Sequence, residues 1–335
     1  MVGPCVQGLS RLHPRIKLVQ DGLRIGTRKS PLAMAQTEQM RQRILAANPS
    51  LSDEATVLAP MTTTGDQMLS GPLMEVGGKG LFTRELDDAL LAGAIDLAVH
   101  SAKDLPTVLP DGIELITIPE REDPYDAWIG ADNMTVDQLP QGAKLGSASL
   151  RRRAQILARR PDLVPVVLRG NVGTRLDKLA RGDAHATMLA HAGLRRLGKT
   201  DVMTCVLDEA LCLPAPTQGI LAITARTGDE RVARILAPLE DPTVRAQATA
   251  ERAFLATLDG SCRTPIAALS RVEGDRVHLT GRVLPPNGSE CYEIAGDAPV
   301  AEAEALGLQL GRDMRAKAGE AFFAALPQMV ADAWG

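Results

Sequence analysis

From Leu23 to Thr224, short apolar runs of strand length alternate with stretches whose apolar residues recur at helical spacing. Two proline-rich segments, 119–124 and 213–217, interrupt this alternation. Strands that alternate with helices build α/β domains, and the interruptions divide the chain into two of them. We expect the run at 219–224 to return to the first domain. Two such crossings would create a cleft whose walls move by hinge bending.

After about residue 240 the pattern changes, because an Ala-rich helical stretch precedes three short strand-like runs separated by turn residues. This predicts a third, α+β domain with an antiparallel sheet. The expected units are a disordered leader at 1–20, domain 1 at 21–119 and 218–240, domain 2 at 120–217, and domain 3 at 241–335.

The expected strands lie at 23–27, 55–60, 95–99, 114–118, 164–168, 186–190, 219–224, 266–269, 277–280 and 292–294. The expected helices lie at 30–48, 81–92, 149–158, 192–194, 244–258, 301–317 and 320–333. Ser30 is a good N-cap for the first helix, and Thr174 and Asp177 form a capping pattern for a further one.

Composition argues against several classes of function. The net charge of −4 argues against non-specific nucleic-acid binding, and two Trp, two Tyr and four Phe are too few for a platform of stacked rings. No apolar run approaches the roughly 20 residues of a membrane helix. The five cysteines form no C-x-x-C pair and the five histidines are scattered, which indicates reduced thiols in the cytoplasm and no metal site.

The mostly apolar run at 95–99 ends in polar residues that include Lys103 and Asp104. Such a run is typical of a buried parallel strand, and ligands of open α/β sheets bind at the carboxyl edge of the strands. Lys103 and Asp104 are therefore candidates for chemistry, although a carboxylate that caps the following turn is the alternative for Asp104. His100 is expected to be a core histidine with a satisfied hydrogen bond.

Arginines stand at strand ends and helix starts, although the helix dipole does not favour cations at a helix start. Their position predicts an anionic ligand, since free N–H groups and guanidinium forks both bind carboxylates and phosphates. The alternative is a solvated helix face whose arginines reach local acids. We expect ligand contacts for Arg28, Arg152, Arg169 and Arg175, and local partners for Arg153, Arg159 and Arg160.

Two loops are the remaining candidates. The loop at 77–80 lacks the spacing of a phosphate loop and is expected to be a mobile loop or a lid, with Lys79 available to an anion. Cys262 lies in a tight turn at 258–265, where Arg263 could favour the thiolate, although a small buried cysteine is the alternative. Cys205, Cys212 and Cys291 lie in apolar surroundings and are expected to be packing residues.

The chain contains, in order, the stretches R-I-G-T-R-K-S-P-L-A, V-G-G-K-G-L-F-T-R-E-L, D-L-A-V-H-S-A-K-D-L-P, E-R-E-D-P-Y-D-A-W, S-L-R-R, L-R-G-N-V-G-T-R-L-D-K-L, A-G-L-R-R-L-G, L-P-A-P-T-Q-G and L-D-G-S-C-R-T-P-I. This series resembles the porphobilinogen deaminase (hydroxymethylbilane synthase) family of tetrapyrrole biosynthesis. The resemblance extends from about Leu23 to Pro265 and is weaker beyond.

The resemblance implies two domains like those of periplasmic binding proteins, a third α+β domain, and a dipyrromethane cofactor in thioether linkage to Cys262. It places the catalytic carboxylate at Asp104. It implies cofactor contacts for Cys262, Lys103, Asp104, Ser147, Ser149, Arg151 and Arg152. It implies substrate contacts for Arg28, Ser30, Lys79, Arg169, Arg175, Arg196 and Gln218.

The implied reaction deaminates four porphobilinogen molecules and joins them head to tail into hydroxymethylbilane, with release of four ammonia. Porphobilinogen carries an acetate and a propionate, which suits arginines grouped around one acid. Loss of ammonia leaves an azafulvenium cation that a nearby carboxylate can stabilise. We expect a monomer with no nucleic-acid or membrane partner. The alternative function is a non-catalytic solute-binding protein for a small carboxylate, which needs a secretory signal and leaves Cys262 without a role.

Overall fold

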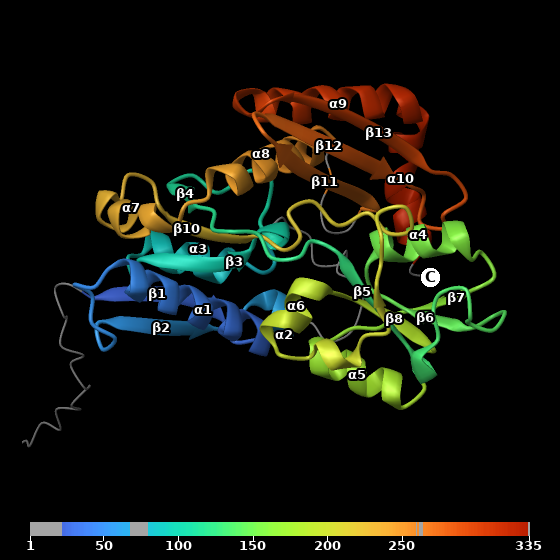
Figure 1. Ribbon diagram of the computed structural model, residues 1–335, viewed down its shortest axis with the longest axis horizontal. Helices are drawn as coiled ribbons and strands as arrows, with labels where there is room; N and C mark the ends of the chain where they lie inside the picture. The colour runs from blue at the N-terminus through green and yellow to red at the C-terminus, as the bar shows by residue number, and fades with distance from the viewer. Residues whose placement is uncertain (1–21, 68–79, 259, 261–263, 334–335) are drawn as a thin grey trace, which may run out of the picture.

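The computed structural model describes residues 22–67, 80–258, 260 and 264–333, which form two mixed sheets and one antiparallel sheet (Figure 1). The first sheet has the strand order β2-β1-β3-β10-β4, and the second has the order β7-β6-β8-β5-β9. The third, β11-β12-β13, lies above the other two in Figure 1. The predicted fold class, two α/β units and an α+β unit, is confirmed.

The first sheet places the carboxyl ends of β1 and β3 side by side. Its strands are β1 (Leu23–Arg28), β2 (Thr56–Met61), β3 (Leu97–Ser101), β4 (Ile113–Thr117) and β10 (Leu221–Arg226), and its helices are α1 (Pro31–Ala47), α2 (Thr64–Gln67), α3 (Arg84–Leu91) and α7 (Glu230–Leu236). Strands β2 and β3 run parallel to β1, whereas β10 runs antiparallel to β3 and β4. The run at 95–99 therefore has one antiparallel neighbour, unlike a strand of a wholly parallel sheet.

The second sheet repeats this plan. Its strands are β5 (Asp126–Gly130), β6 (Lys144–Gly146), β7 (Val164–Val166), β8 (Ala186–Ala190) and β9 (Cys205–Val206), and its helices are α4 (Leu150–Arg159), α5 (Val172–Ala180) and α6 (His191–Arg196). Strand β6 runs parallel to β7 and β8, whereas β5 runs antiparallel to β8 and β9. In both sheets, the strand that follows a proline-rich crossing is antiparallel to its neighbours.

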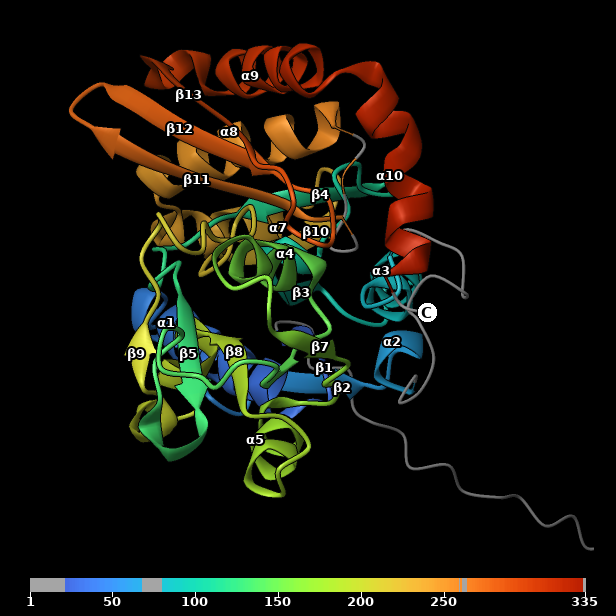
Figure 2. The ribbon, with the colours of Figure 1, turned by 90° about the vertical axis from the view of Figure 1, so that its right-hand side faces the viewer.

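The third sheet packs against two long helices. It consists of β11 (Ile266–Glu273), β12 (Arg276–Val283) and β13 (Tyr292–Pro299), with α8 (Pro242–Thr257), α9 (Ala303–Ala318) and α10 (Glu320–Asp332). Helices α8 and α9 approach closely because Gly307 has no side chain: a Cβ there would lie 2.3 Å from the carbonyl oxygen of Ala250. Helix α10 descends from α9 (Figure 2), and Ala333 at its end accepts a hydrogen bond from Arg153 of α4.

Two helix starts differ from the predictions. Asn171 caps α5 and accepts a hydrogen bond from the N–H of Thr174 at 2.9 Å, so the predicted cap formed by Thr174 and Asp177 is wrong. Asn is among the best N-caps, and here it stands one residue before the first turn. Helix α3 begins at 84 and not at 81, because Gly80, with φ at 92°, forms a turn with Thr83.

Strand β10 spans 221–226 where 219–224 was predicted, and β7 ends two residues before its predicted end. The predicted leader at 1–20 lies outside the described residues. Within the described ranges, no helix has the length and apolar character needed to cross a membrane.

Candidate functional site

Asp104 ends a short 3-10 helix, Ala102–Asp104, that directly follows β3. Its Oδ2 atom lies 3.6 Å from Nη1 of Arg28, which ends the neighbouring strand β1. Asp66 of α2 holds the same guanidinium, with its Oδ1 2.5 Å from Nη2, and the ring centre of Phe82 lies 4.3 Å away. About 29% of the Asp104 side chain is exposed, so this carboxylate is accessible to a ligand.

Lys103 is partly buried and connects the first sheet with the second crossing. Its Nζ donates to Oε1 of Gln218 at 2.9 Å. Nε2 of Gln218 donates in turn to Oδ1 of Asp126 at 2.9 Å and to the carbonyl of Pro124 at 2.7 Å. Burial lowers the pKa of Lys103 to about 8, and Arg152 adds to this effect, whereas nearby carboxylates oppose it. The ammonium therefore titrates close to neutrality.

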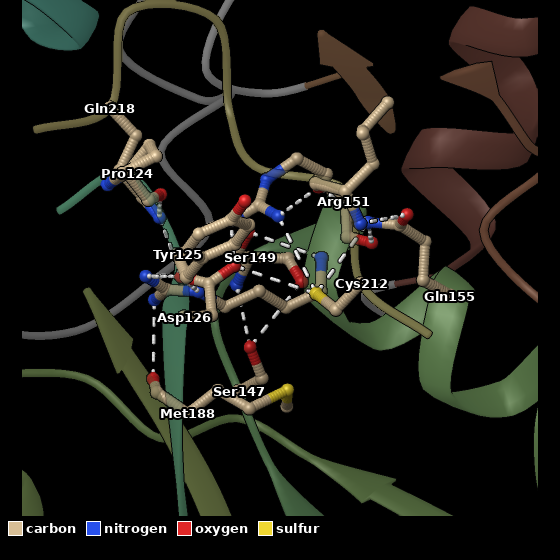
Figure 3. A network of polar contacts seen from close by, with 12 residues as sticks. Pro124, Tyr125, Asp126, Ser147, Ser149, Arg151, Gln155, Met188, Cys212 and Gln218 are labelled. Atoms are coloured by element: carbon tan, nitrogen blue, oxygen red, sulfur yellow. Dashed lines mark hydrogen bonds and ion pairs between the residues drawn. The ribbon is translucent and has the colours of Figure 1, made fainter. Parts of the chain in front are cut away.

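Asp126, the first residue of β5, is fully buried and accepts hydrogen bonds from two guanidinium groups of α4 (Figure 3). Nη2 of Arg151 lies 2.7 Å from Oδ2, while Nε and Nη2 of Arg152 lie 2.9 and 2.7 Å from Oδ1. Burial alone would raise the pKa of Asp126, but Arg151 and Arg152 hold that pKa well below its usual range. The carboxylate is therefore charged throughout the neutral range.

Further arginines lie close to this cluster. Nε of Arg175 donates to the carbonyl of Gly170 at 2.8 Å, and Nη2 of Arg196 donates to the carbonyl of Gly219 at 2.9 Å. Burial lowers the pKa of Arg175 and of Arg196 to about 10, and Arg152 and Arg169 lower that of Arg175 as well. Among the described residues, the buried Nε atoms of Arg169 and Arg196 have no hydrogen-bond partner. Buried polar atoms are usually paired, so these donors fit an anionic ligand.

The three serines of the predicted site bond to backbone groups. Ser30 and Ser149 are the N-caps of α1 and α4, where they accept hydrogen bonds from the N–H groups of Ala33 at 3.3 Å and Arg152 at 3.4 Å. Ser147 accepts a hydrogen bond from the N–H of Ser149 at 3.1 Å. These contacts fix the start of α4 and with it the position of its two arginines.

The predicted site residues are only partly brought together. The hydrogen bonds and ion pairs described above form two groups: Arg28 with Asp104, and Lys103 with Gln218, Arg151 and Arg152 through Asp126. The two groups adjoin at Lys103, whose ammonium the Asp104 carboxylate favours electrostatically. Arg175 lies near both Arg152 and Arg169, since, besides burial, each of these cations lowers its pKa. Cys262 and Lys79 lie outside the described residues.

Two carboxylates were missed by sequence reasoning. Asp66 holds Arg28, and Asp126 holds the arginines of α4, where a ligand anion was expected. The available signal for Asp126 was a charged residue at the start of the apolar run Ala127–Ile129. The local partners expected for Arg159 and Arg160 are confirmed, as these side chains pair with Asp137 and Asp162.

The remaining predictions have mixed outcomes. His100 is buried, with Nε2 3.0 Å from the hydroxyl of Thr224, as expected for a satisfied core histidine. Cys212 is buried, and burial raises the pKa of its thiol to about 12. Cys205 is partly buried. Cys291 is exposed, so its predicted packing role is wrong; it immediately precedes β13, an edge strand.

Family models match most of the chain. The porphobilinogen deaminase, dipyromethane cofactor binding domain matches residues 23–234, and the porphobilinogen deaminase, C-terminal domain matches residues 246–316. The porphobilinogen deaminase of Paracoccus denitrificans is 49% identical over 304 residues, which cover 91% of this chain and 97% of that relative.

Solved structures give weaker similarities. An ABC transporter from Parabacteroides distasonis has a TM-score of 0.41 at 12% identity, covering 92% of this chain and 95% of its own. A TRAP periplasmic solute-binding protein from Desulfovibrio salexigens has a TM-score of 0.40 at 12% identity, covering 93% of this chain and 95% of its own. Both scores are low, and the fold is defined by the three sheets described above.

Proposed function

The chain belongs to the porphobilinogen deaminase family, and from this premise we propose which residues carry out the reaction. The activity is that of a hydroxymethylbilane synthase: it joins porphobilinogen units on a dipyrromethane primer in tetrapyrrole biosynthesis. Family membership favours this activity over the alternative of a non-catalytic solute-binding protein.

Asp104 is the catalytic carboxylate in this proposal. Its carboxylate is accessible, follows the carboxyl end of β3 and lies beside the cations of the site. When ammonia leaves porphobilinogen, positive charge spreads over the pyrrole, and a carboxylate near the ring nitrogen stabilises that charge. After the new carbon–carbon bond forms, the same carboxylate can accept the proton that the ring must lose.

The excess of positive charge is the observation that carries the proposal. Six cations form the cluster: Arg28, Lys103, Arg151, Arg152, Arg169 and Arg175. Three carboxylates lie among them: Asp66, Asp104 and Asp126. Within this set the cations outnumber the carboxylates by three, in a protein whose net charge is −4. Each pyrrole brings two carboxylates, and guanidinium forks bind such groups in bidentate fashion.

The same residues fit the dipyrromethane cofactor. Lys103, Arg151 and Arg152, with the hydroxyls of Ser147 and Ser149, would hold its carboxylates, while Arg28, Ser30, Arg169, Arg175, Arg196 and Lys79 would contact substrate. Gln218 was predicted to contact substrate, but it is fully buried and would act on the ligand through Lys103. The orphaned Nε atoms of Arg169 and Arg196 support an anionic occupant. When bound, the cofactor supplies the free pyrrole carbon from which the chain grows.

Cys262 is the proposed anchor of the cofactor. Three cysteines have described positions, Cys205, Cys212 and Cys291, and loss of solvent around the thiol raises the pKa of each, even at Cys291, whose residue as a whole is exposed. Their thiolates are therefore less available.

Intact-mass spectrometry of the purified chain tests the anchor. We expect a mass excess equal to two porphobilinogens less two ammonias, which is lost in Cys262→Ser. Cys291→Ser, which changes an exposed cysteine, is the matched control and should keep the excess. An unmodified mass on active wild-type protein would falsify the anchor.

We also propose that the chain works as a cytoplasmic monomer, with domain 1 at 21–119 and 218–240, domain 2 at 120–217 and domain 3 at 241–335. The free thiols of Cys205, Cys212 and Cys291 support a reducing compartment. Light scattering on a sizing column tests the oligomeric state: the expected mass is 35.6 kDa plus the cofactor.

A further inference from the structure

We propose that Asp126 is a positioning residue that orients three cations of the site. It holds Arg151 and Arg152 directly, and it holds Lys103 through the amide of Gln218. The inference rests on the proposed function, in which these cations bind the carboxylates of the pyrroles.

Each guanidinium is fixed on two sides. Arg151 donates through Nη2 to Asp126 and through Nη1 to the carbonyl of Leu213, each at 2.7 Å. Arg152 donates through Nε and Nη2 to Asp126, and through Nη1 to the carbonyl of Met188 at 3.2 Å. A guanidinium is planar and rigid, so two anchored sides determine where its remaining N–H bonds point.

The amide of Gln218 transmits this order to Lys103. Gln218 is fully buried, and two oxygen acceptors, on Asp126 and Pro124, lie beside its Nε2. Both require a donor, so the NH2 group must face them and the carbonyl oxygen must face Lys103. Oε1 then accepts the hydrogen bond from Nζ at 2.9 Å. The carboxylate thereby determines the direction in which an ammonium of the other α/β unit is held.

The charge of Asp126 is as important as its shape. One carboxylate faces two guanidinium groups and one ammonium, so it aligns them without neutralising them. Two positive charges remain for ligand carboxylates. Because Asp126 is fully buried and bonded to these donors, it acts through them and is not itself a catalytic residue.

The test compares Asp126→Asn with the wild-type full-length chain. An Asn side chain turns an NH2 group toward donors, which breaks the alignment while keeping the size. Intact mass gives the cofactor content of each purified chain, and then the gain of cofactor mass by any unloaded fraction during incubation with porphobilinogen. KM and kcat for porphobilinogen are measured across pH on the loaded protein, and circular dichroism checks folding.

For Asp126→Asn, we expect cofactor loading to slow and KM to rise by about tenfold or more, the effect of losing hydrogen bonds between charged groups, with a smaller fall in kcat. The alkaline limb of the 1/KM profile should move to lower pH, because Asp126 supports the charged form of Lys103. Asp126→Glu should restore part of the affinity, since it restores the charge.

Asp96→Asn is the matched control. Asp96 is a carboxylate with 4% exposure that binds the side chain of Arg24 at 2.8 and 3.0 Å, and it precedes β3 at the end opposite Asp104. This variant should lose stability but keep KM and loading. Wild-type loading and KM in Asp126→Asn, or an equal loss in Asp96→Asn, would overturn the proposal.

Gln218→Leu decides the question if Asp126→Asn does not fold. It removes the link to Lys103 and keeps both arginine contacts of Asp126. We expect its alkaline limb to shift, and an unchanged limb contradicts the relay. If the wild-type chain neither carries the cofactor mass after purification, nor gains it with porphobilinogen, nor makes product, the proposed function itself fails, whatever the variants do.

Discussion

The core of the third domain and the cluster around Asp126 are both buried, but they consist of opposite kinds of side chain. In the third domain, Phe254, Val277 and Met314 lie fully buried in one apolar cluster under the sheet. Around Asp126, the buried groups are Arg151, Arg152 and Gln218. Apolar burial stabilises a fold in proportion to area, whereas burial of charge costs free energy unless each group is paired. The first region therefore provides stability, and the second provides oriented charge.

The pKa values of the charged region show the free-energy cost of burying its charges. Burial lowers the pKa of Lys103 to about 8 and opposes ionisation of Asp126, whose pKa stays low because of Arg151 and Arg152. A buried ion-pair cluster of this kind is weak evidence for stability, since well-packed apolar side chains in its place often stabilise a protein as much. Under the proposed function, the cluster serves to bind ligand carboxylates.

The largest expected effect is on turnover, in the charged region. Asp104→Asn should keep the fold and lower turnover by about 10²- to 10⁴-fold, the usual contribution of a positioned acid or base. Product formation and thermal unfolding are measured together. Asp137→Asn, which changes an exposed carboxylate paired with Arg159, is the control and should keep activity. Wild-type rates in Asp104→Asn would count against the assignment and weaken the comparison.

The next effect is on stability, in the third domain. Phe254 is fully buried, and its ring packs directly against Gly281. A Cβ atom on Gly281 would lie only 2.3 Å from the ring. Phe254→Ala should lower the free energy of unfolding by about 3–5 kcal/mol, from lost burial and the cavity left behind. Urea unfolding measures this, and Phe254→Leu should lose less. A large fall in turnover per folded molecule would break the division between the two regions.

The pH dependence of stability sharpens the comparison. Lys103 has its pKa lowered from 10.5 to about 8 in the folded state, so between these values the unfolded chain binds more protons. Its contribution to stability therefore rises from about pH 8 to 10.5. Asp126 has a lowered pKa, so its contribution is complete above about pH 4 and is lost as the pH falls further.

Urea unfolding across pH measures both slopes. Lys103→Met should remove the alkaline rise, whereas Phe254→Leu should keep it while lowering the whole curve. An alkaline rise that survives in Lys103→Met would assign it to another group.

The smallest effect concerns a charged pair at the surface of the third domain. Nε of Arg276 lies 2.6 Å from Oδ2 of Asp297, and both side chains are nearly half exposed. Arg276→Ala should change the free energy of unfolding by no more than about 1 kcal/mol, as exposed pairs do. A larger loss in urea unfolding would mean that geometry alone, without burial, gives an ion pair its strength here.

Local sequence patterns determined much of this protein. The alternation of strands and helices, the N-cap at Ser30 and the position of Asp104 after a buried strand could all be predicted, because each depends on residues within a few positions. The ordered motifs also identified the family. Predictions failed where neighbours competed, as at the cap of α5, or where exposure depended on a sheet edge, as at Cys291.

Tertiary structure alone decided which charges meet. Asp126 and Arg152 are 26 residues apart, and Lys103 and Gln218 are 115 apart, so no periodicity links them. The same arginine spacing suits a solvated helix face, a ligand site or an internal ion pair. Which of these forms depends on the buried carboxylate that folding brings to the helix, because charge pairing acts through space and not along the chain.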